Sequence, residues 1–99
     1  MKCARRGYRY DQTVERSAAM PIVLRIEGFR FLFYANEGDP REPAHIHVRV
    51  GRDEAKFWIS PEVRLAYNRG LNGHTLNRAR KIAEEHRDFF ERAWNDYFS

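Results

Sequence analysis

The sequence predicts an α+β domain, in which an antiparallel sheet of four or five strands has one face covered by a long C-terminal helix. Apolar residues alternate at period two through most of residues 22–68, which is the pattern of half-buried strands. From residue 76 onward they recur at spacings of three and four, the pattern of an amphipathic helix. With 99 residues, 42% of them hydrophobic, the chain can build one domain around one core.

Five segments have the alternation expected of strands. Gly28 separates the first two, which suggests a tight hairpin. For the last segment, a short helix after Pro61 competes with a strand, but the alternation favours the strand. In chain order the five segments are residues 22–27, 29–34, 45–50, 54–60 and 63–68.

The rest of the chain predicts one helix that begins after Asn72, a residue type favoured at the N-cap. Its early residues are basic and its later ones mostly acidic, which opposes the helix dipole, so tertiary packing must hold it. A helix of about 26 residues would be about 39 Å long, and a bend or break within it is an alternative. The face expected to pack on the sheet contains Ile82, Phe89, Phe90 and Trp94.

Most of the net charge of +4 lies near the N-terminus. Residues 1–19 hold five basic and two acidic groups, which accounts for +3 of it. This segment has neither strand nor helix period, so we expect a disordered extension before a domain of residues 20–99; a nucleic-acid-binding arm is the alternative reading. The total charge is therefore not evidence that the domain binds nucleic acid.

Cysteine content and hydropathy indicate the cellular compartment of the protein. Cys3 is the only cysteine, so the chain forms no internal disulfide and no cysteine-based zinc site. No apolar run reaches the roughly 18–20 residues that a membrane span needs. We expect a cytoplasmic protein without a membrane contact.

The alternation sorts the strand residues onto two faces. The apolar face, expected under the helix, comprises Ile22, Leu24, Ile26, Phe29, Phe31, Phe33, Ile46, Val48, Val50, Ala55, Phe57, Ile59, Val63 and Leu65. The opposite face carries an excess of basic side chains together with histidines and aromatics, a composition that suits RNA. An ordinary solvent-facing sheet surface is the simpler interpretation. Trp58 fits it poorly, because an exposed tryptophan usually has a partner or an oligomer interface.

His45 and His47 are the sharpest chemical signal. Two residues apart on a strand, they point the same way at a spacing of about 6.6 Å. As an acid–base pair they could act on the 2′-hydroxyl and leaving oxygen of RNA. The cationic side chains expected to hold the phosphate are Arg49, Lys56 and Arg64.

Two other interpretations of the pair remain. As structural residues, both would be polar groups on a solvent face, one of them bonded to the proline-rich loop before the strand. As metal ligands, they would need a third donor such as Glu42, Glu54 or His86. No second ligand motif has a recognisable spacing, so the sequence predicts no metal site and no cofactor.

Several stretches together resemble a known family. They are MPIVLR (20–25), GFRF (28–31), NEG (36–38), EPAHIHV (42–48), EAKFW (54–58), NRG (68–70) and WNDYF (94–98). Over residues 20–99 the chain resembles the small bacterial family catalogued as domain of unknown function 4160. The resemblance implies a prokaryotic, cytoplasmic protein whose gene neighbours that of another small protein, as in a toxin–antitoxin pair. The matched candidate positions are Glu42, His45, His47, Lys56, Trp58, Asn68 and Arg69.

Two hypotheses for function follow. The first is a toxin-like protein acting on RNA, with His45 and His47 as acid and base. The second is a non-enzymatic interaction module, either an antitoxin-like partner of the neighbouring gene product or a homo-oligomer, that uses the sheet face around Trp58. At the end of the last strand, Arg69 is a candidate anion contact near the helix N-terminus, whereas a plain turn at Gly70 is the alternative.

Overall fold

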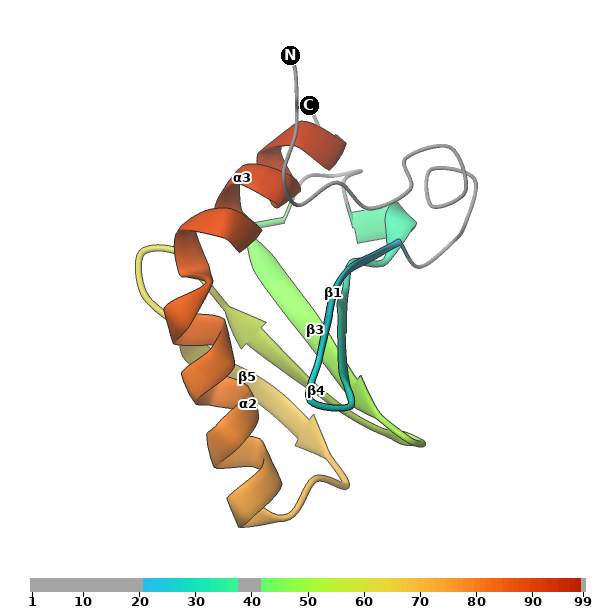
Figure 1. Cartoon of the computed structure of the whole chain (residues 1–99). Coiled ribbons are helices and arrows are strands. Elements are labelled where there is room, and N and C mark those ends of the chain that lie inside the picture. The colour runs from blue at the N-terminus through green and yellow to red at the C-terminus, as the bar shows by residue number, and fades with distance from the viewer. Residues whose placement is uncertain (1–20, 38–41, 99) are drawn as a thin grey trace.

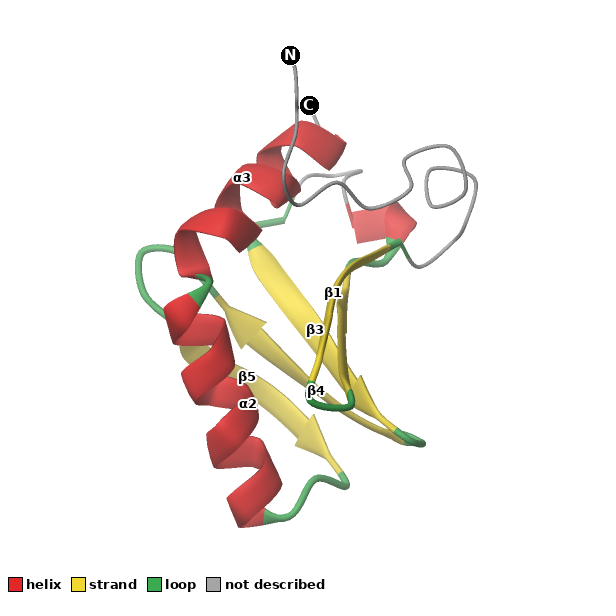
Figure 2. Ribbon diagram, in the orientation of Figure 1, coloured by secondary structure: helices red, strands yellow, loops and turns green. Residues whose placement is uncertain are grey.

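A five-stranded antiparallel sheet forms one layer of the molecule and two helices form the other (Figures 1 and 2). The computed structural model describes residues 21–37 and 42–98, so the expected extension of residues 1–19 lies outside the described residues. Strand order follows chain order. The strands are β1 (Ile22–Ile26), β2 (Phe29–Leu32), β3 (His45–Val50), β4 (Asp53–Trp58) and β5 (Arg64–Arg69), and the short 3-10 helix η1 (Ala35–Glu37) follows β2. The α+β fold and the fifth strand are confirmed.

Short turns set the register of the hairpins. Between β1 and β2, Glu27 and Gly28 have φ of 54° and 84°, and Ile26 pairs with Phe29. Two successive positive φ values are what a type I′ turn requires, and its twist matches that of the strands. Between β3 and β4, Gly51 adopts φ 60° in the turn that pairs Val50 with Asp53. The tight hairpin expected at Gly28 is confirmed.

The C-terminal helix is broken into two. Helix α2 (Gly73–Glu85) begins at Asn72, whose side chain accepts a 2.8 Å hydrogen bond from the Thr75 amide, so the predicted N-cap is correct. His86 ends α2, and α3 (Arg87–Phe98) follows at once. The break lets the two helices lie along the sheet in sequence instead of forming one straight rod (Figure 1). No helix in the described part of the chain is long and apolar enough to cross a membrane.

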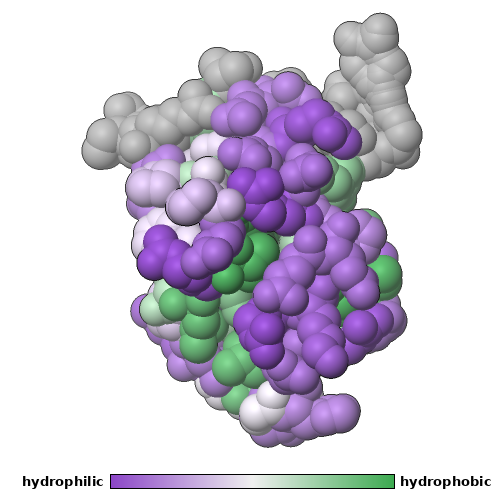
Figure 3. Space-filling model, turned by 90° about the vertical axis from the view of Figure 1, so that its left-hand side faces the viewer, coloured by the Kyte–Doolittle hydropathy of each residue, from purple (hydrophilic) through white to green (hydrophobic). Residues whose placement is uncertain are grey.

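The core lies between the sheet and the helices. Phe31 stacks on Phe90 with ring centroids 5.2 Å apart, and Phe33 meets the edge of Trp94 at 5.3 Å. Seen from the helix side, the surface is mostly hydrophilic with a hydrophobic seam (Figure 3). Fully buried members of the core are Phe31, Phe33, Ile46, Val48, Ala55, Phe57, Ile59, Ala79, Ile82, Ala83, Phe90 and Ala93.

Two β-bulges overturn part of the predicted apolar face. The register shifts at Val23 in β1, so Val23 is buried while Leu24 is only half-buried. It shifts again in β5, where Phe57 pairs with Leu65 and Lys56 with Tyr67, leaving Ala66 as the extra residue. Leu65 pairs with the buried Phe57 and so lies on the apolar face, but in the edge strand β5 it is 46% exposed, and its predicted burial is wrong. A bulge adds one residue to one strand and thereby reverses the alternation beyond it.

Candidate functional site

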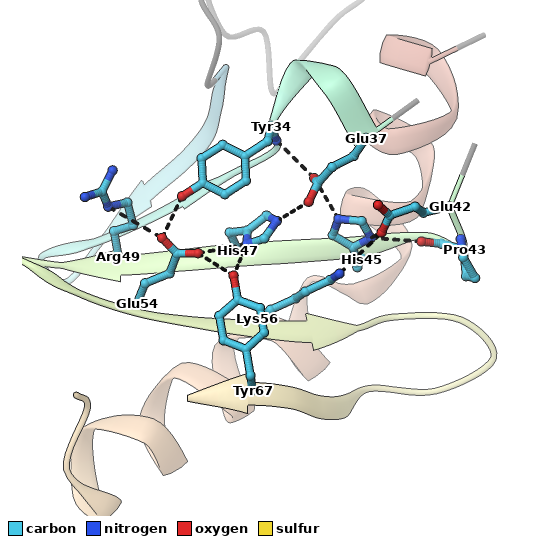
Figure 4. Close-up of polar contacts among 10 residues, drawn as sticks. All are labelled: Tyr34, Glu37, Glu42, Pro43, His45, His47, Arg49, Glu54, Lys56 and Tyr67. Atoms are coloured by element: carbon cyan, nitrogen blue, oxygen red, sulfur yellow. Dashed lines mark hydrogen bonds and ion pairs between the residues drawn. The ribbon is translucent and has the colours of Figure 1, made fainter. Parts of the chain in front are cut away.

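A group of buried and half-buried polar side chains lies on the sheet face opposite the helices (Figure 4). It draws on β3, β4 and β5, on η1 and on the residue between β2 and η1 that directly precedes η1. We call it the histidine–carboxylate cluster, comprising Tyr34, Glu37, His45, His47, Glu54 and Tyr67. Strand pairing explains how it assembles, because His47 faces Lys56 in β4 and Lys56 faces Tyr67 in β5.

His45 has a polar neighbour at each of its ring nitrogens. Its Nδ1 lies 2.9 Å from the carbonyl oxygen of Pro43. Its Nε2 lies 2.7 Å from Glu37 Oε1, but the two are not aligned for a hydrogen bond, so this nitrogen has no hydrogen-bond partner within the described residues. Aromatic rings enclose the imidazole, with the centroid of Trp94 at 4.5 Å and that of Trp58 at 5.6 Å.

His47 lies between two carboxylates. Its Nδ1 is 3.1 Å from Glu54 Oε2, and its Nε2 is 2.7 Å from Glu37 Oε2. The Tyr34 ring packs edge-on against the imidazole at 4.3 Å. The two oxygens of Glu37 therefore each face the Nε2 of a different histidine.

Neighbouring groups keep both carboxylates ionised. Burial raises the pKa of Glu37, but the contacts with His45 and His47 outweigh it and hold the pKa well below its usual range. Burial likewise raises the pKa of Glu54, whereas hydrogen bonds from Tyr34 and Tyr67 and the contact with His47 lower it further than burial raises it. Each tyrosine hydroxyl donates a 2.6 Å hydrogen bond to one oxygen of Glu54. The cluster thus has two anionic members and ordered donors around them.

The histidines are buried, which corrects the expectation that they are polar groups on a solvent face. Side-chain exposure is 0% for His45 and 2% for His47. Rings from both layers and the η1 carboxylate cover the start of β3, so alternation alone does not reveal their burial. The predicted bond to the proline-rich loop is present, through Pro43. Neither imidazole stands open to a substrate in this arrangement.

Other predicted residues border the cluster. Lys56 Nζ lies 3.3 Å from Glu42 Oε1 and 4.4 Å from the centre of the Trp58 ring. Trp58 is half-buried, and its ring already has a cationic partner within the chain, Lys56. Glu42 Oε1 is 3.7 Å from His45 Nδ1, on the side of the ring away from Glu37.

Strand register aligns four arginines in one line across this face. Arg25 pairs with Arg30, Arg30 with Arg49, Arg49 with Glu54, and Glu54 with Arg69. Directly paired residues project on the same face, so the line spans five strands, or about 19 Å at about 4.8 Å per strand. We call it the arginine row. It passes beside the histidine–carboxylate cluster and shares Glu54 with it.

The remaining predicted positions fall outside both groups. Arg64 is exposed opposite Trp58, in the line that begins at His45. Strict alternation along residues 63–68 predicts Asn68 on the polar face, but the bulge in β5 pairs it with the buried Ala55, so that prediction is wrong. Its side chain bonds both the amide and the carbonyl of Leu71, at 3.1 and 2.8 Å. The turn interpretation of this segment is confirmed, with Gly70 at φ 105°.

Three members of the cluster, Tyr34, Glu37 and Tyr67, are not among the candidate site residues that the sequence predicts. Glu37 lies in a loop segment, and only its place in the family-like NEG string marked it. Strict alternation from Val63 and Leu65 predicts Tyr67 on the apolar face, but the bulge at Ala66 moves it to the polar face. Loop position and bulges depend on contacts distant in sequence, so neither could be read from local pattern.

Comparison with curated proteins and with solved structures gives no significant match. A family model does match, over residues 28–95, which is more than half of the chain. This range contains the whole histidine–carboxylate cluster, the EPAHIHV string and the EAKFW string. The chain therefore belongs to the family described as a domain of unknown function (DUF4160).

Proposed function

We propose that this domain binds single-stranded RNA across the sheet face opposite the helices. The observation that carries the proposal is the arginine row, in which Arg25, Arg30, Arg49 and Arg69 share one line with a single acidic residue, Glu54. The row has an excess of three positive charges. Like charges on directly paired strand positions repel each other, and the phosphates of a nucleic acid relieve that repulsion.

The acidic groups near the row neutralise it only in part. Glu54 is engaged by Tyr34, Tyr67 and His47, and it lies 4.0 Å from Arg49 Nε. Glu27, beside the first hairpin, is bonded to Arg78 of α2 at 2.8 Å. A shallow hollow at this hairpin is lined by both Arg25 and Arg30, so the first two arginines border one concave surface.

A sheet surface with aromatic side chains favours a single strand over a duplex groove. Single-stranded RNA is commonly bound on sheets, where bases stack on aromatic rings and the backbone follows basic groups. Here the Arg69 guanidinium lies 4.5 Å from the centre of the Tyr67 ring. A cation and an aromatic ring therefore lie together at the β5 end of the arginine row. His45 and His47 are not acid and base in this proposal, because both rings are buried.

Fluorescence anisotropy with a labelled single-stranded RNA tests the proposal. If all four arginines contact phosphates, the logarithmic salt slope is about −2.8, and affinity falls about 50-fold between about 50 and 200 mM salt. The double variant R25A/R69A removes two exposed members of the row and should reduce the slope by about 1.4.

The matched control removes two charges from the helix layer. Lys81 and Arg92 are exposed on α2 and α3, and K81A/R92A should leave affinity and slope close to those of the unchanged protein. Absence of RNA binding, or an equal loss in both double variants, would contradict the proposal. Single-stranded DNA of the same base sequence shows whether the 2′-hydroxyl contributes.

A toxin-like role is the cellular extension of this proposal. Expression of the chain should then arrest bacterial growth, and R25A/R69A should relieve the arrest. Harmless expression of a protein that binds RNA in vitro would remove the toxin-like role and leave RNA binding standing.

A protein-interaction module is the second candidate. Leu65 is the one exposed large hydrophobic residue among the described positions, and it lies on the edge strand β5. Exposed edge strands are sites where another chain can add to the sheet. Stable co-purification with the product of the neighbouring gene, lost in L65K and retained in R25A/R69A, would favour this candidate over RNA binding.

A further inference from the structure

Glu37, His45 and His47 have the arrangement of a metal centre, and we infer that they bind one divalent transition-metal ion, with Zn²⁺ as the expected occupant. This inference is independent of RNA binding. One donor atom from each of the three residues lies within 4.8 Å of the other two. The donors are the two Nε2 atoms and the Glu37 carboxylate, which faces one nitrogen with each oxygen at 2.7 Å.

The contacts that each imidazole makes at Nδ1, away from the proposed metal ion, support this assignment. A metal-binding histidine usually donates its second ring N–H to a carboxylate or a backbone carbonyl, which orients the ring and fixes its tautomer. Both forms occur here, since His45 Nδ1 faces the Pro43 carbonyl at 2.9 Å and His47 Nδ1 faces Glu54 at 3.1 Å. With the protons on Nδ1, both Nε2 atoms carry a lone pair that can bind a metal ion.

A buried nitrogen without a hydrogen bond is the second, separate observation. His45 is 0% exposed, and its Nε2 has no hydrogen-bond partner in the described part of the chain although Glu37 Oε1 is 2.7 Å away. A buried nitrogen without a hydrogen bond is unusual in a folded protein and calls for an explanation. A cation bound by both His45 Nε2 and Glu37 would give each group a favourable contact, which accounts for the burial of this nitrogen.

The donor set selects the class of metal. Two imidazole nitrogens and one carboxylate oxygen suit Zn²⁺ and its neighbours, whereas Mg²⁺ and Ca²⁺ prefer oxygen ligands alone. Around a tetrahedral Zn²⁺ at about 2.0–2.1 Å, donors lie about 3.3 Å apart. The Glu37 carboxylate therefore has to withdraw by roughly 0.6 Å from each imidazole, a shift that a side chain on a short 3-10 helix can make by rotating.

Three protein donors leave a coordination position open. Structural zinc sites are usually closed by four protein ligands, whereas catalytic sites keep a position for water or substrate. Tyr34 covers one side of His47, and Trp94 and Trp58 lie against His45. This apolar lining limits access of water to the bound ion and strengthens its field.

Metal binding by the purified full-length chain tests the inference. The background variant Cys3→Ser removes the only thiol, after which the protein is stripped with a chelator and titrated with ZnCl₂ by calorimetry and equilibrium dialysis. We expect one Zn²⁺ per chain, retained in excess Mg²⁺. Titration with CoCl₂ should give the visible absorption of a Co²⁺ ion with nitrogen and oxygen ligands.

Two variants distinguish this site from adventitious binding. Glu37→Gln keeps the shape of the side chain and should weaken Zn²⁺ binding at least tenfold. The double variant H74Q/H86Q removes the other two histidines of the chain and should leave affinity and stoichiometry unchanged. Near-ultraviolet circular dichroism checks that each variant folds.

The inference is overturned if no stoichiometric Zn²⁺ binds, or if a folded Glu37→Gln variant binds as tightly as its background. Loss of binding in H74Q/H86Q together with retention in Glu37→Gln would assign the ion to surface histidines instead.

Discussion

The hydroxyl of Tyr67 donates a 2.6 Å hydrogen bond to Oε2 of Glu54, across the register between β5 and β4. Tyr34 makes the equivalent bond to Oε1 from the opposite side. Two phenols thus share one carboxylate, and this explains both why Glu54 stays ionised in a half-buried position and why neither tyrosine releases its proton easily.

Alkaline titration should reveal both tyrosines. Burial, followed by the hydrogen bond to Glu54 and its charge, raises the pKa of Tyr34 to about 12 and raises the pKa of Tyr67 further. Tyrosines of the unfolded chain ionise near 10. Folding stability should therefore fall as pH rises from about 10 toward 12, because the unfolded state loses those protons first.

Ultraviolet absorption of phenolate measures this, with urea midpoints recorded over the same pH range. Tyr34→Phe and Tyr67→Phe should each reduce the late-titrating component. Persistence of the whole component in both variants would show that other tyrosines cause it.

Glu54 should also influence the proposed metal centre. Its Oε2 lies 3.1 Å from His47 Nδ1, where a carboxylate orients the ring and makes the ligand more basic. Glu54→Gln should weaken Zn²⁺ binding by about 10- to 100-fold without changing the stoichiometry. Calorimetry measures the change, and Glu42→Gln, on the nearby His45, provides the control because Glu42 lies 3.7 Å from Nδ1 of a ring already held by Pro43. Equal effects of the two substitutions would contradict the assigned role of Glu54.

Gly70 should tolerate no side chain. It adopts φ 105°, and a Cβ atom there would clash with Asp53 Oδ1 and lie 2.7 Å from Asp53 Cγ. Gly70→Ala should lower the free energy of unfolding by about 1–3 kcal/mol, mainly through backbone strain. Gly73→Ala is the matched control, since Gly73 opens α2 with no atom near the added methyl group, and it should be neutral or slightly stabilising. Urea denaturation compares the two, and similar losses would argue against backbone strain at residue 70.

Substitutions of Phe31 and Leu65 test which residues of the predicted apolar face contribute to the hydrophobic core. Phe31 is fully buried and stacks on Phe90, whereas Leu65 is 46% exposed. Phe31→Ala should cost about 3–5 kcal/mol of stability, and Leu65→Ala should change it by no more than about 0.5 kcal/mol. Chemical denaturation measures both values, and a large loss in Leu65→Ala would mean that this edge residue is covered by a partner in solution.

Local patterns predicted most of the fold. The alternation that starts at Ile22 and the spacing of Ile82, Phe90 and Trp94 depend only on the geometry of strands and helices. Asn72 and Gly28 mark a cap and a turn for reasons internal to a few residues. For that reason the element types, their order and the two-layer arrangement could be derived without knowledge of long-range contacts.

The candidate site was derived only in part. The residue types of His45, His47 and Glu54 mark them as candidates. Their burial and the residues that they contact do not follow from their spacing in the sequence. Glu37 meets both histidines from another segment of the chain. Tyr67 reaches them because one extra residue in β5 turns it to the polar face.

The sequence by itself determined the chemistry that was present: a pair of histidines on one strand, carboxylates near them, and arginines at alternating positions. Only the tertiary structure decided what these groups do to each other. Register places four arginines in one row, a loop carboxylate closes on two imidazoles, and aromatic rings from both layers exclude water from them. The physical reason is that strand register and burial depend on contacts between residues far apart in the chain, which local periodicity does not encode.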